Sequence, residues 1–510
     1  MNEIAAAEQV GFPILSTLVF LPTLTIVVLG FIRNELAVRR VALTGAVVVL
    51  ALSLVLAATF RKGVTDFQFA EQVPWVQSMG LSYHLAVDGV SILFVPLTAL
   101  LVVIVILASW TSVRHQPKAY LMALLAFETA AIGVFTSVDL ILFFVFWELI
   151  LIPTYVLTKV WGDGPQRGPA ALRYVLSMLL GSAALLVGFI LLGVGHRSAA
   201  GSGGALSFDL LVLMDSTVSP GTQSAVFFLF AFAFAFKAPL FPLHAWMPAI
   251  LQHGPIGVAV LLGGLKMGVF GFLRFVMPLV PDAFAEWSWL IAGLGVTAVL
   301  YGALIALVQP DLRRLTAFAS ISHVGLAMLG LSSLNAAGLQ GTLFLLVNLG
   351  LVSTAMLLVA GFVHHRVGST DLSSLGGLAV HAPALTTFAL VACLGALALP
   401  GTSGFPGEFL ILLGAFRAHG WFATIAVLTV ILAAAYVLIY FEHAFHGRVR
   451  SAIVSATVDL RPREAVSACI LGVTIVGLGF FPAALLDYSS ASVDDLVDRL
   501  NPSTTIATRN

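Results

Sequence analysis

Long apolar runs recur along the whole chain and alternate with short polar segments. A helix needs about 20 apolar residues to cross the hydrocarbon core, and helices satisfy their own backbone groups there. The pattern predicts about fourteen spans, near residues 14–32, 41–60, 90–110, 119–136, 138–160, 174–194, 224–242, 256–276, 288–307, 316–333, 339–362, 384–414, 421–445 and 465–482. The alternating pattern of a membrane barrel is absent from the sequence. We therefore expect an all-α integral membrane protein.

The seventh and twelfth spans contain prolines in their interiors. Pro239 and Pro242 interrupt the seventh, and Pro400 and Pro406 interrupt the twelfth. Proline removes a backbone donor and clashes with the preceding turn. Non-helical backbone at this depth is tolerated where it is buried in protein or lines a wet cavity. We predict that both helices are broken.

The position of the two breaks suggests an internal repeat. Spans four to eight and nine to thirteen form two sets of five, so the break in span seven corresponds to the break in span twelve. An odd number of spans inverts the second copy, a recurrent design in transporters. The predicted organisation is residues 1–118 for helices one to three, 119–280 for the first repeat, 281–447 for the inverted second repeat, and 448–510 for helix fourteen and the tail.

The composition supports a membrane location. Hydrophobic residues make up 60% and charged residues 9%, against about 25% charged in soluble proteins. So few polar residues exclude a cytosolic enzyme, and 24 basic residues balanced by 24 acidic ones, without basic runs, argue against nucleic-acid binding. The first apolar run lacks a basic start and a cleavage site, so we expect a retained anchor.

No cofactor or metal is expected in this chain. Its two cysteines, Cys393 and Cys469, are too few for an iron–sulfur cluster, and no Cys/His spacing suits a metal. No nucleotide-binding glycine motif follows a strand pattern.

Basic residues predict the orientation. Loops after odd-numbered spans carry 15 of them and the opposite side, counting both tails, carries 7. Arginine and lysine are enriched on the cytoplasmic side, so both termini are expected outside, and a bacterial cell membrane is the expected location. Segment 67–84 is expected to form an interfacial hairpin or short helix, with Trp75 as an interface anchor.

Ionisable side chains within the spans are the candidate chemistry. Each costs roughly 2.5–3.5 kcal/mol at mid-membrane on insertion scales, so each needs a reason. The five clearest cases are Glu148, Lys237, Lys266, His323 and Glu408, and Glu128 is a weaker sixth. Lys237 and Glu408 each lie beside a predicted helix break.

Structural explanations compete with a functional one. A lysine or glutamate near a span end commonly extends to water, but Glu148 and Lys266 lie far from their ends. Glu408 follows a Pro-Gly pair, so a position in a loop is also compatible with the sequence. His323 also fits a neutral histidine bonded to a backbone carbonyl, and for Glu128 both interpretations stay open.

At these residues the chain resembles the antiporter-like subunit M of respiratory complex I. The similar runs are HLAVDGVSILFVPLT, VFWELILIPTYVL, AFKAPLFPLHAWMP, KMGVFGFLRF and LPGTSGFPGEFLILLGAF, which occur in that order between about 80 and 416. The resemblance implies a fourteen-helix fold with inverted repeats and a proton channel. By motif match, it implies that Glu148, Lys237, Lys266, His323 and Glu408 are the family's functional charges.

The resemblance also implies partners. Other membrane-arm subunits would adjoin this chain, including neighbouring antiporter-like ones, and separate subunits would carry FMN and iron–sulfur clusters. The sequence departs from the family pattern after His244-Ala245-Trp246, where Ala249–Pro255 lacks the usual acid and histidine. His253 is a candidate replacement, with His244 as a further polar group. In span eleven Asn348 is followed by leucine in place of histidine, so Asn348 or water would bridge that position.

These residues predict proton transfer through the membrane. Burial disfavours the charged form of a lysine and a nearby carboxylate favours it, so Glu148 can switch Lys237 between holding and releasing a proton. The predicted path continues through Lys266 and His323 to Glu408. The main alternative is a subunit of a multisubunit Na⁺/H⁺ antiporter, or of a related membrane hydrogenase or carbon-uptake complex. A structural scaffold with relic charges and a solute transporter are weaker alternatives.

Overall fold

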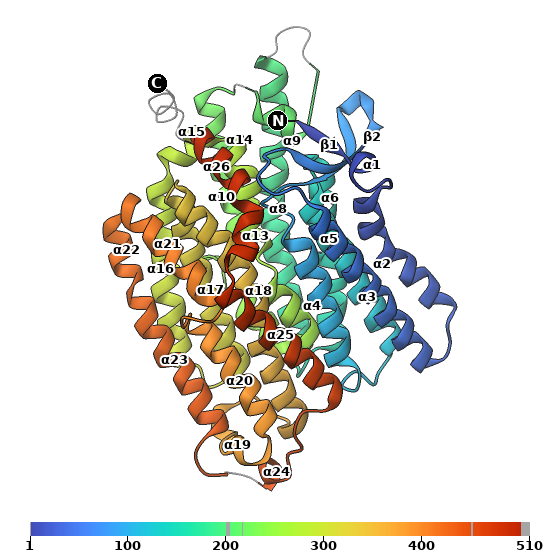
Figure 1. Ribbon diagram of the computed structural model, residues 1–510, viewed down its shortest axis with the longest axis vertical. Coiled ribbons are helices and arrows are strands. Elements are labelled where there is room, and N and C mark those ends of the chain that lie inside the picture. Colours follow the sequence, from blue (N-terminus) through green and yellow to red (C-terminus); the bar gives the residue numbers. More distant parts are fainter. Residues whose placement is uncertain (1, 200–204, 217, 450–451, 501–510) are drawn as a thin grey trace.

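A computed structural model describes residues 2–199, 205–216, 218–449 and 452–500. Helices dominate it, which confirms the all-α prediction (Figure 1). Among the described residues, eleven helices are long and apolar enough to cross a membrane. The chain is an integral membrane protein.

The helices of the apolar layer follow the predicted spans closely. They are α2 (Ile14–Phe31), α3 (Glu35–Thr59), α4 (Phe94–Ser109), α5 (Pro117–Thr136), α6 (Leu140–Leu149), α7 (Leu151–Trp161), α8 (Arg167–Ala199), α10 (Pro220–Lys237), α11 (Trp246–His253), α12 (Ile256–Gly264), α13 (Met267–Gly271), η2 (Phe272–Val276), α14 (Met277–Leu279), α16 (Ser288–Leu307), α17 (Leu312–Ser332), α18 (Ala336–Val367), α20 (Pro383–Ala396), α21 (Gly404–Ala418), α22 (Gly420–Ala426), α23 (Leu428–Phe445) and α25 (Pro462–Phe480).

Three predicted spans are not among these eleven helices. One is the short helix α4, and the others are the interrupted segments α10–α11 and α20–α21. The number fourteen therefore stays a prediction.

Both predicted breaks are present. Helix α10 ends at Lys237, and α11 begins only at Trp246, with Pro239 and Pro242 in the turn between them. Helix α20 ends at Ala396, and α21 begins at Gly404 after a turn that contains Pro400. Pro406 lies in the first turn of α21, where its missing backbone donor costs no helical hydrogen bond.

A third break, at Lys266, was not predicted. Helix α12 ends at Gly264, and α13 begins at Met267, so Lys266 lies in two residues of non-helical backbone. Its φ of −91° and ψ of 56° lie outside the helical region. The π-helical turn η2 follows, which is an additional departure from α-helical winding.

Four Asp-Leu pairs form two copies of one motif. Asp139 caps α6 and pairs with Asp209 through the backbone bonds Leu140 N to Phe208 O and Leu210 N to Val138 O, both 2.9 Å. Asp311 caps α17 and pairs with Asp371 in the same way, with Leu312 N to Thr370 O and Leu372 N to Pro310 O.

The two copies of this motif lie at opposite ends of the bundle. Helix α9 (Leu210–Met214) follows Asp209 at the upper end of Figure 1, and α19 (Leu378–His381) follows Asp371 at the lower end. This arrangement is what an inverted repeat of spans four to eight and nine to thirteen requires. The domain boundaries themselves stay a prediction.

The remaining elements lie outside the apolar layer. They are β1 (Glu3–Ala5), α1 (Ala6–Gln9), β2 (Phe67–Val76), η1 (Gln77–Met79), β3 (Leu81–Val87), α15 (Pro281–Glu286), η3 (Leu372–Ser374), α24 (Ala452–Ser455) and the polar helix α26 (Ala483–Leu500). Strands β2 and β3 form the expected hairpin, β1 adds in parallel, and Trp75 is exposed.

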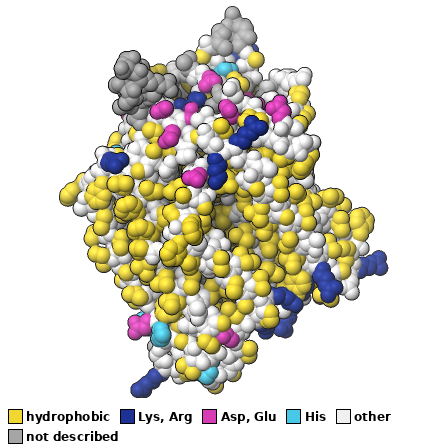
Figure 2. Space-filling model, in the orientation of Figure 1, with side chains coloured by type: hydrophobic (Ala, Val, Ile, Leu, Met, Phe, Trp, Pro, Cys, Tyr) yellow, Lys and Arg dark blue, Asp and Glu magenta, His cyan; other side chains and the backbone are white. Residues whose placement is uncertain are grey.

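The surface has the pattern of a membrane protein. Figure 2 shows a broad apolar band between two ends where the charged side chains gather. Strand β1 and helix α26 lie at the same end (Figure 1). Of the basic residues counted for orientation, Arg450 and Arg509 lie outside the described residues.

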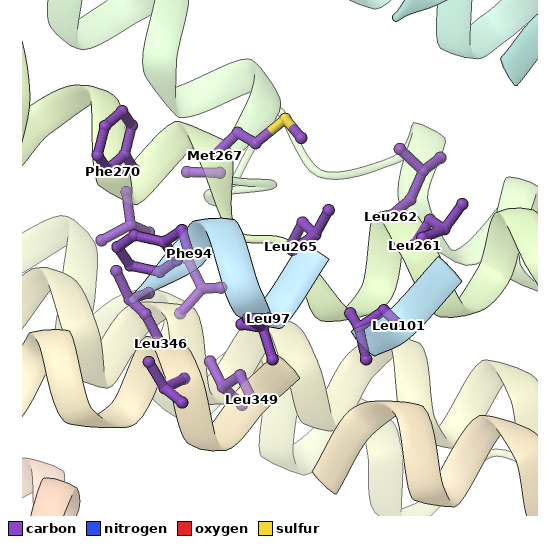
Figure 3. Packing of buried hydrophobic residues seen from close by; sticks show 14 of the residues in the cluster. Phe94, Leu97, Leu101, Leu261, Leu262, Leu265, Met267, Phe270, Leu346 and Leu349 are labelled. Atoms are coloured by element: carbon purple, nitrogen blue, oxygen red, sulfur yellow. The ribbon is translucent and has the colours of Figure 1, made fainter. Parts of the chain in front are cut away.

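The core packs closely around the break at Lys266. Phe94, Leu97 and Leu101 of α4 lie between the α12–α13 segment and α18 (Figure 3). Leu265 and Met267, on either side of Lys266, are buried in this apolar cluster. The break is therefore enclosed by protein, as irregular backbone at this depth requires.

Candidate functional site

Lys237 is buried at the end of α10, where the proline-containing turn begins. Its Nζ lies 3.9 Å from the centroid of the Trp147 ring and 3.4 Å from the Trp147 backbone oxygen. A desolvated cation over a tryptophan face gains about 2 kcal/mol or more. The contact with the ring therefore stabilises the charged form of this buried side chain.

Glu148 follows Trp147 on α6, one residue from the small interruption between α6 and α7. It interacts with Lys237 electrostatically, but the two form no ion-pair contact among the described residues. Its buried Oε1 has no hydrogen-bond partner in that part of the chain. Glu148 is therefore near Lys237 without being bound to it.

Gly268 brings the two lysine breaks together. A Cβ added there would lie 2.2 Å from Ala238 N and 2.7 Å from the Lys237 carbonyl carbon. The start of α13 therefore packs directly on the end of α10, and only glycine permits this approach. The end of α10, which carries Lys237, and the start of α13, which follows Lys266, are immediate neighbours.

Lys266 is buried, and its Nζ donates to the carbonyl oxygen of Gly263. That carbonyl lies in the last turn of α12, where helical carbonyls lack intrahelical partners. Lys266 also interacts electrostatically with His323 on α17. It therefore stands between the Lys237 segment and the second half of the chain.

His323 and Glu408 are in direct contact. Nε2 of His323 lies 3.2 Å from Oε1 of Glu408, across the α17–α21 interface. Nδ1 lies 2.8 Å from the Ala319 carbonyl oxygen, and because a carbonyl only accepts, Nδ1 must carry a proton. Nε2 then either donates to an ionised Glu408 or accepts from a protonated one, so the pair can hold and pass one proton.

Asn348 lies at the break in span twelve. Its Oδ1 accepts a hydrogen bond of 2.6 Å from Ser403 Oγ, the residue before α21. The amide thus ties α18 to the turn that precedes Glu408. This places Asn348 as a support of the break.

Glu128 on α5 is completely buried, and neither carboxyl oxygen has a partner among the described residues. No contact in that part of the chain joins it to the other candidate residues. It remains apart from the group formed by Lys237, Lys266, His323 and Glu408.

His244 and His253 line one cavity near the turn after α10. The His244 ring lies 4.9 Å from the Tyr301 ring, and its Nδ1 has no partner within the described residues. His253 ends α11 and is partly exposed. Within the part of the chain that the structure describes, neither histidine has a contact with the His323–Glu408 pair.

Two contacts of buried cationic side chains were not predicted from the sequence. Trp147 is one, since its ring contact with Lys237 is visible only in three dimensions. Arg274 is the other: it was counted among the outer basic residues, but it is buried in η2 and forms a two-pronged ion pair with Asp88, one bond being 3.0 Å. Asp88, an acid at the start of the apolar run before α4, is the sequence signal that could have found this ion pair.

These features define a polytopic helical membrane protein with titratable groups at breaks in its helices. A family model described as "NADH:quinone oxidoreductase/Mrp antiporter, TM" matches residues 137–433. Together with relatives at 33–35% identity, this shows that the chain belongs to the NADH-quinone oxidoreductase subunit M family.

Two relatives illustrate the match. NADH-quinone oxidoreductase subunit M of Rickettsia conorii is 34% identical over 496 residues, covering 95% of this chain and 99% of the relative. NADH-ubiquinone oxidoreductase chain 4 of Arabidopsis thaliana is 34% identical over 487 residues, covering 95% and 97%.

Solved structures agree. A chain of respiratory complex I from Thermus thermophilus with bound NADH has a TM-score of 0.87 and 34% identity, covering 95% of this chain and 99% of that one. A chain of the Mrp complex from Dietzia has a TM-score of 0.79 at 22% identity, covering 97% and 99%, a similarity that shows the fold alone. The chain is thus related to a subunit of an oxidoreductase complex.

Proposed function

We propose that this chain translocates protons as a membrane-arm subunit of an NADH:quinone oxidoreductase. The observation that carries the proposal is the His323–Glu408 contact of 3.2 Å, which lies within electrostatic reach of Lys266. Ionisable side chains in an apolar interior lower the stability of the protein, so their presence there indicates a function. The relatives named above make complex I the favoured parent complex over a separate cation/proton antiporter.

The relay begins at Lys237. A proton held on its ammonium is stabilised by the Trp147 ring and by Glu148 when that carboxylate approaches. Withdrawal of Glu148 favours release toward Lys266, whose backbone segment packs beside that of Lys237. Gly263 O and water in the break would then orient the proton of Lys266.

The second half of the relay leads outward. His323 receives the proton at Nε2 and transfers it to Glu408, while Nδ1 keeps its proton on the Ala319 carbonyl. The Ser403–Asn348 contact fixes the turn before Glu408, so the carboxyl is held in reach. Glu128, His244 and His253 are supporting polar groups in this proposal.

The energy comes from partners. Moving one charge against 100 mV costs about 2.3 kcal/mol, which a side-chain relay alone does not supply. Quinone reduction in other subunits, which would carry FMN and iron–sulfur clusters, drives the cycle through neighbouring membrane subunits. We place the chain in a bacterial cell membrane with both termini outside, on the distribution of its basic residues.

Proton transport in proteoliposomes tests this function. The purified complex with His323→Ala should acidify the lumen at a small fraction of the wild-type rate during NADH oxidation, and Na⁺ should change neither rate. The exposed His443→Ala serves as the control. Full proton transport with His323→Ala, or transport that requires Na⁺, would contradict the proposal.

A further inference from the structure

A polar cavity of about 360 Å³ lies between α8, α11, α16 and α17. The polar groups on its wall include Arg173, Arg314, Gln166, Gln252 and His253. No carboxylate is among its described lining residues. A cavity with cationic and neutral donors and no acid favours an anionic ligand.

Among the described residues, Arg173 and Arg314 lack the acidic partner that the neighbouring Arg313 has. Arg313 forms an ion pair of 3.0 Å with Asp163, whereas Arg314 and Arg173 form none among the described residues. Nε of Arg314 is buried and has no hydrogen-bond partner there. These guanidinium groups are available to a ligand in the cavity.

An apolar cavity of about 800 Å³ adjoins the polar one. Its wall includes Phe228, Phe232, Phe241 and Leu290, and all its lining residues are apolar. Tyr301 lies where the two cavities meet. The centroid of its ring is 4.8 Å from that of Phe241 on the apolar wall and 4.9 Å from that of His244 on the polar wall.

The two cavities together form a groove along α16, from Tyr301 to Leu290 near the start of that helix. Leu290 precedes Tyr301 by eleven residues, or about 16 Å at 1.5 Å per residue. A ligand that fills both cavities has an anionic head at the end of the bundle and a long apolar tail in the hydrocarbon layer.

We propose that these cavities bind one anionic phospholipid. Its phosphate contacts Arg173 and Arg314, with amide donors from Gln166 and Gln252, and one acyl chain lies along α16 in the apolar cavity. Basic pockets at the ends of membrane helices bind such headgroups. Free phosphate would leave the apolar cavity unused, and a zwitterionic lipid would bring a positive group against two unpaired arginines. The inference does not depend on the proton relay.

Photocrosslinking in the assembled complex tests this site. The probes are phosphatidylglycerol and phosphatidylcholine, each with a photoreactive group in one acyl chain, and peptides are mapped by mass spectrometry. We expect phosphatidylglycerol to label α16 and the segment after α10 more than phosphatidylcholine does. Labelling should fall about fivefold for each arginine changed in Arg173→Gln and Arg314→Gln, and excess inorganic phosphate should not displace the lipid.

Lys159→Gln removes an exposed charge away from the cavity and should leave labelling unchanged. Equal labelling by both lipids would overturn the proposal, as would labelling that survives both arginine changes. Loss of labelling with inorganic phosphate would assign the cavity to a free anion. Absence of label from wild type would mean that a partner segment fills the groove. The comparison of the two lipids on wild type decides the proposal even if the double variant fails to assemble.

Discussion

The ammonium of Lys237 lies over the ring of Trp147, 3.9 Å from its centroid, while the carboxyl of the very next residue, Glu148, is near without contact. The lysine therefore has a permanent aromatic partner and an ionic partner at a distance. A change in the side-chain conformation of Glu148, whose Oε1 has no hydrogen-bond partner among the described residues, would change the second without moving Trp147.

Replacement of Trp147 tests the aromatic contact. Trp147→Leu removes about 2 kcal/mol of cation–ring stabilisation, so NADH-driven proton transport should fall several-fold, and Trp147→Phe should restore part of it. Trp289→Leu, at an exposed tryptophan, is the matched control. Equal activity of the leucine and phenylalanine variants would show that the ring does not stabilise the cation.

The contact between His323 and Glu408 predicts non-additive effects. His323→Ala and Glu408→Gln should each reduce proton transport strongly, and the double variant should be little worse than either, because both changes remove one proton-transfer step. Initial rates of acidification with all four proteins give the coupling. Strictly multiplicative losses would mean that the two residues act independently.

Much of this site is predictable from the sequence, because charges in apolar runs and prolines near Lys237 and Glu408 are local features. The break at Lys266 is not, since no proline marks it. Gly268, two residues after Lys266, lets α13 approach the backbone of Lys237. A glycine's role in a helix contact depends on which segment packs there, and the sequence does not state that.

Gly268→Ala tests this approach. The added methyl group would lie 2.2 Å from a backbone nitrogen that cannot move alone, and overpacking of this kind costs about 1–3 kcal/mol. We expect a lower melting temperature for the purified complex and reduced assembly. Gly221→Ala, where a Cβ meets nothing within 4 Å, should be neutral. Equal melting of both variants would refute the close contact.

Helix counting predicts the repeat, and four Asp-Leu pairs are a second signal of it in the sequence. Asp139-Leu140, Asp209-Leu210, Asp311-Leu312 and Asp371-Leu372 form two matching bridges. Only the structure shows that these pairs meet, because 70 and 60 residues separate the partners along the chain.

Stability should depend on pH through His84 in the outer sheet. Burial opposes its charge, but a hydrogen bond to Asp209 (2.6 Å) and an ion-pair contact with Glu3 (2.7 Å) outweigh it and raise the pKa of His84 from 6.5 to about 9. The protonated form therefore stabilises the fold below pH 6.5, and this contribution, about 3 kcal/mol, is lost as pH rises through 9.

His84→Gln should accordingly lower the melting temperature most at pH 6 and least above pH 9. Thermal unfolding of the purified complex across this range gives the comparison, with the exposed His443→Gln as control. A deficit that is the same at every pH would show that His84 does not act through its charge.

The rate of proton transport, measured together with the rate of quinone reduction, tests the central claim most directly. In sealed vesicles containing the assembled complex, Glu148→Ala and Lys237→Ala should each lower proton transport and coupled quinone reduction together, with Glu442→Ala, at an exposed glutamate of α23, unchanged. An undiminished proton-to-electron ratio, at wild-type turnover, in both site variants would contradict the account.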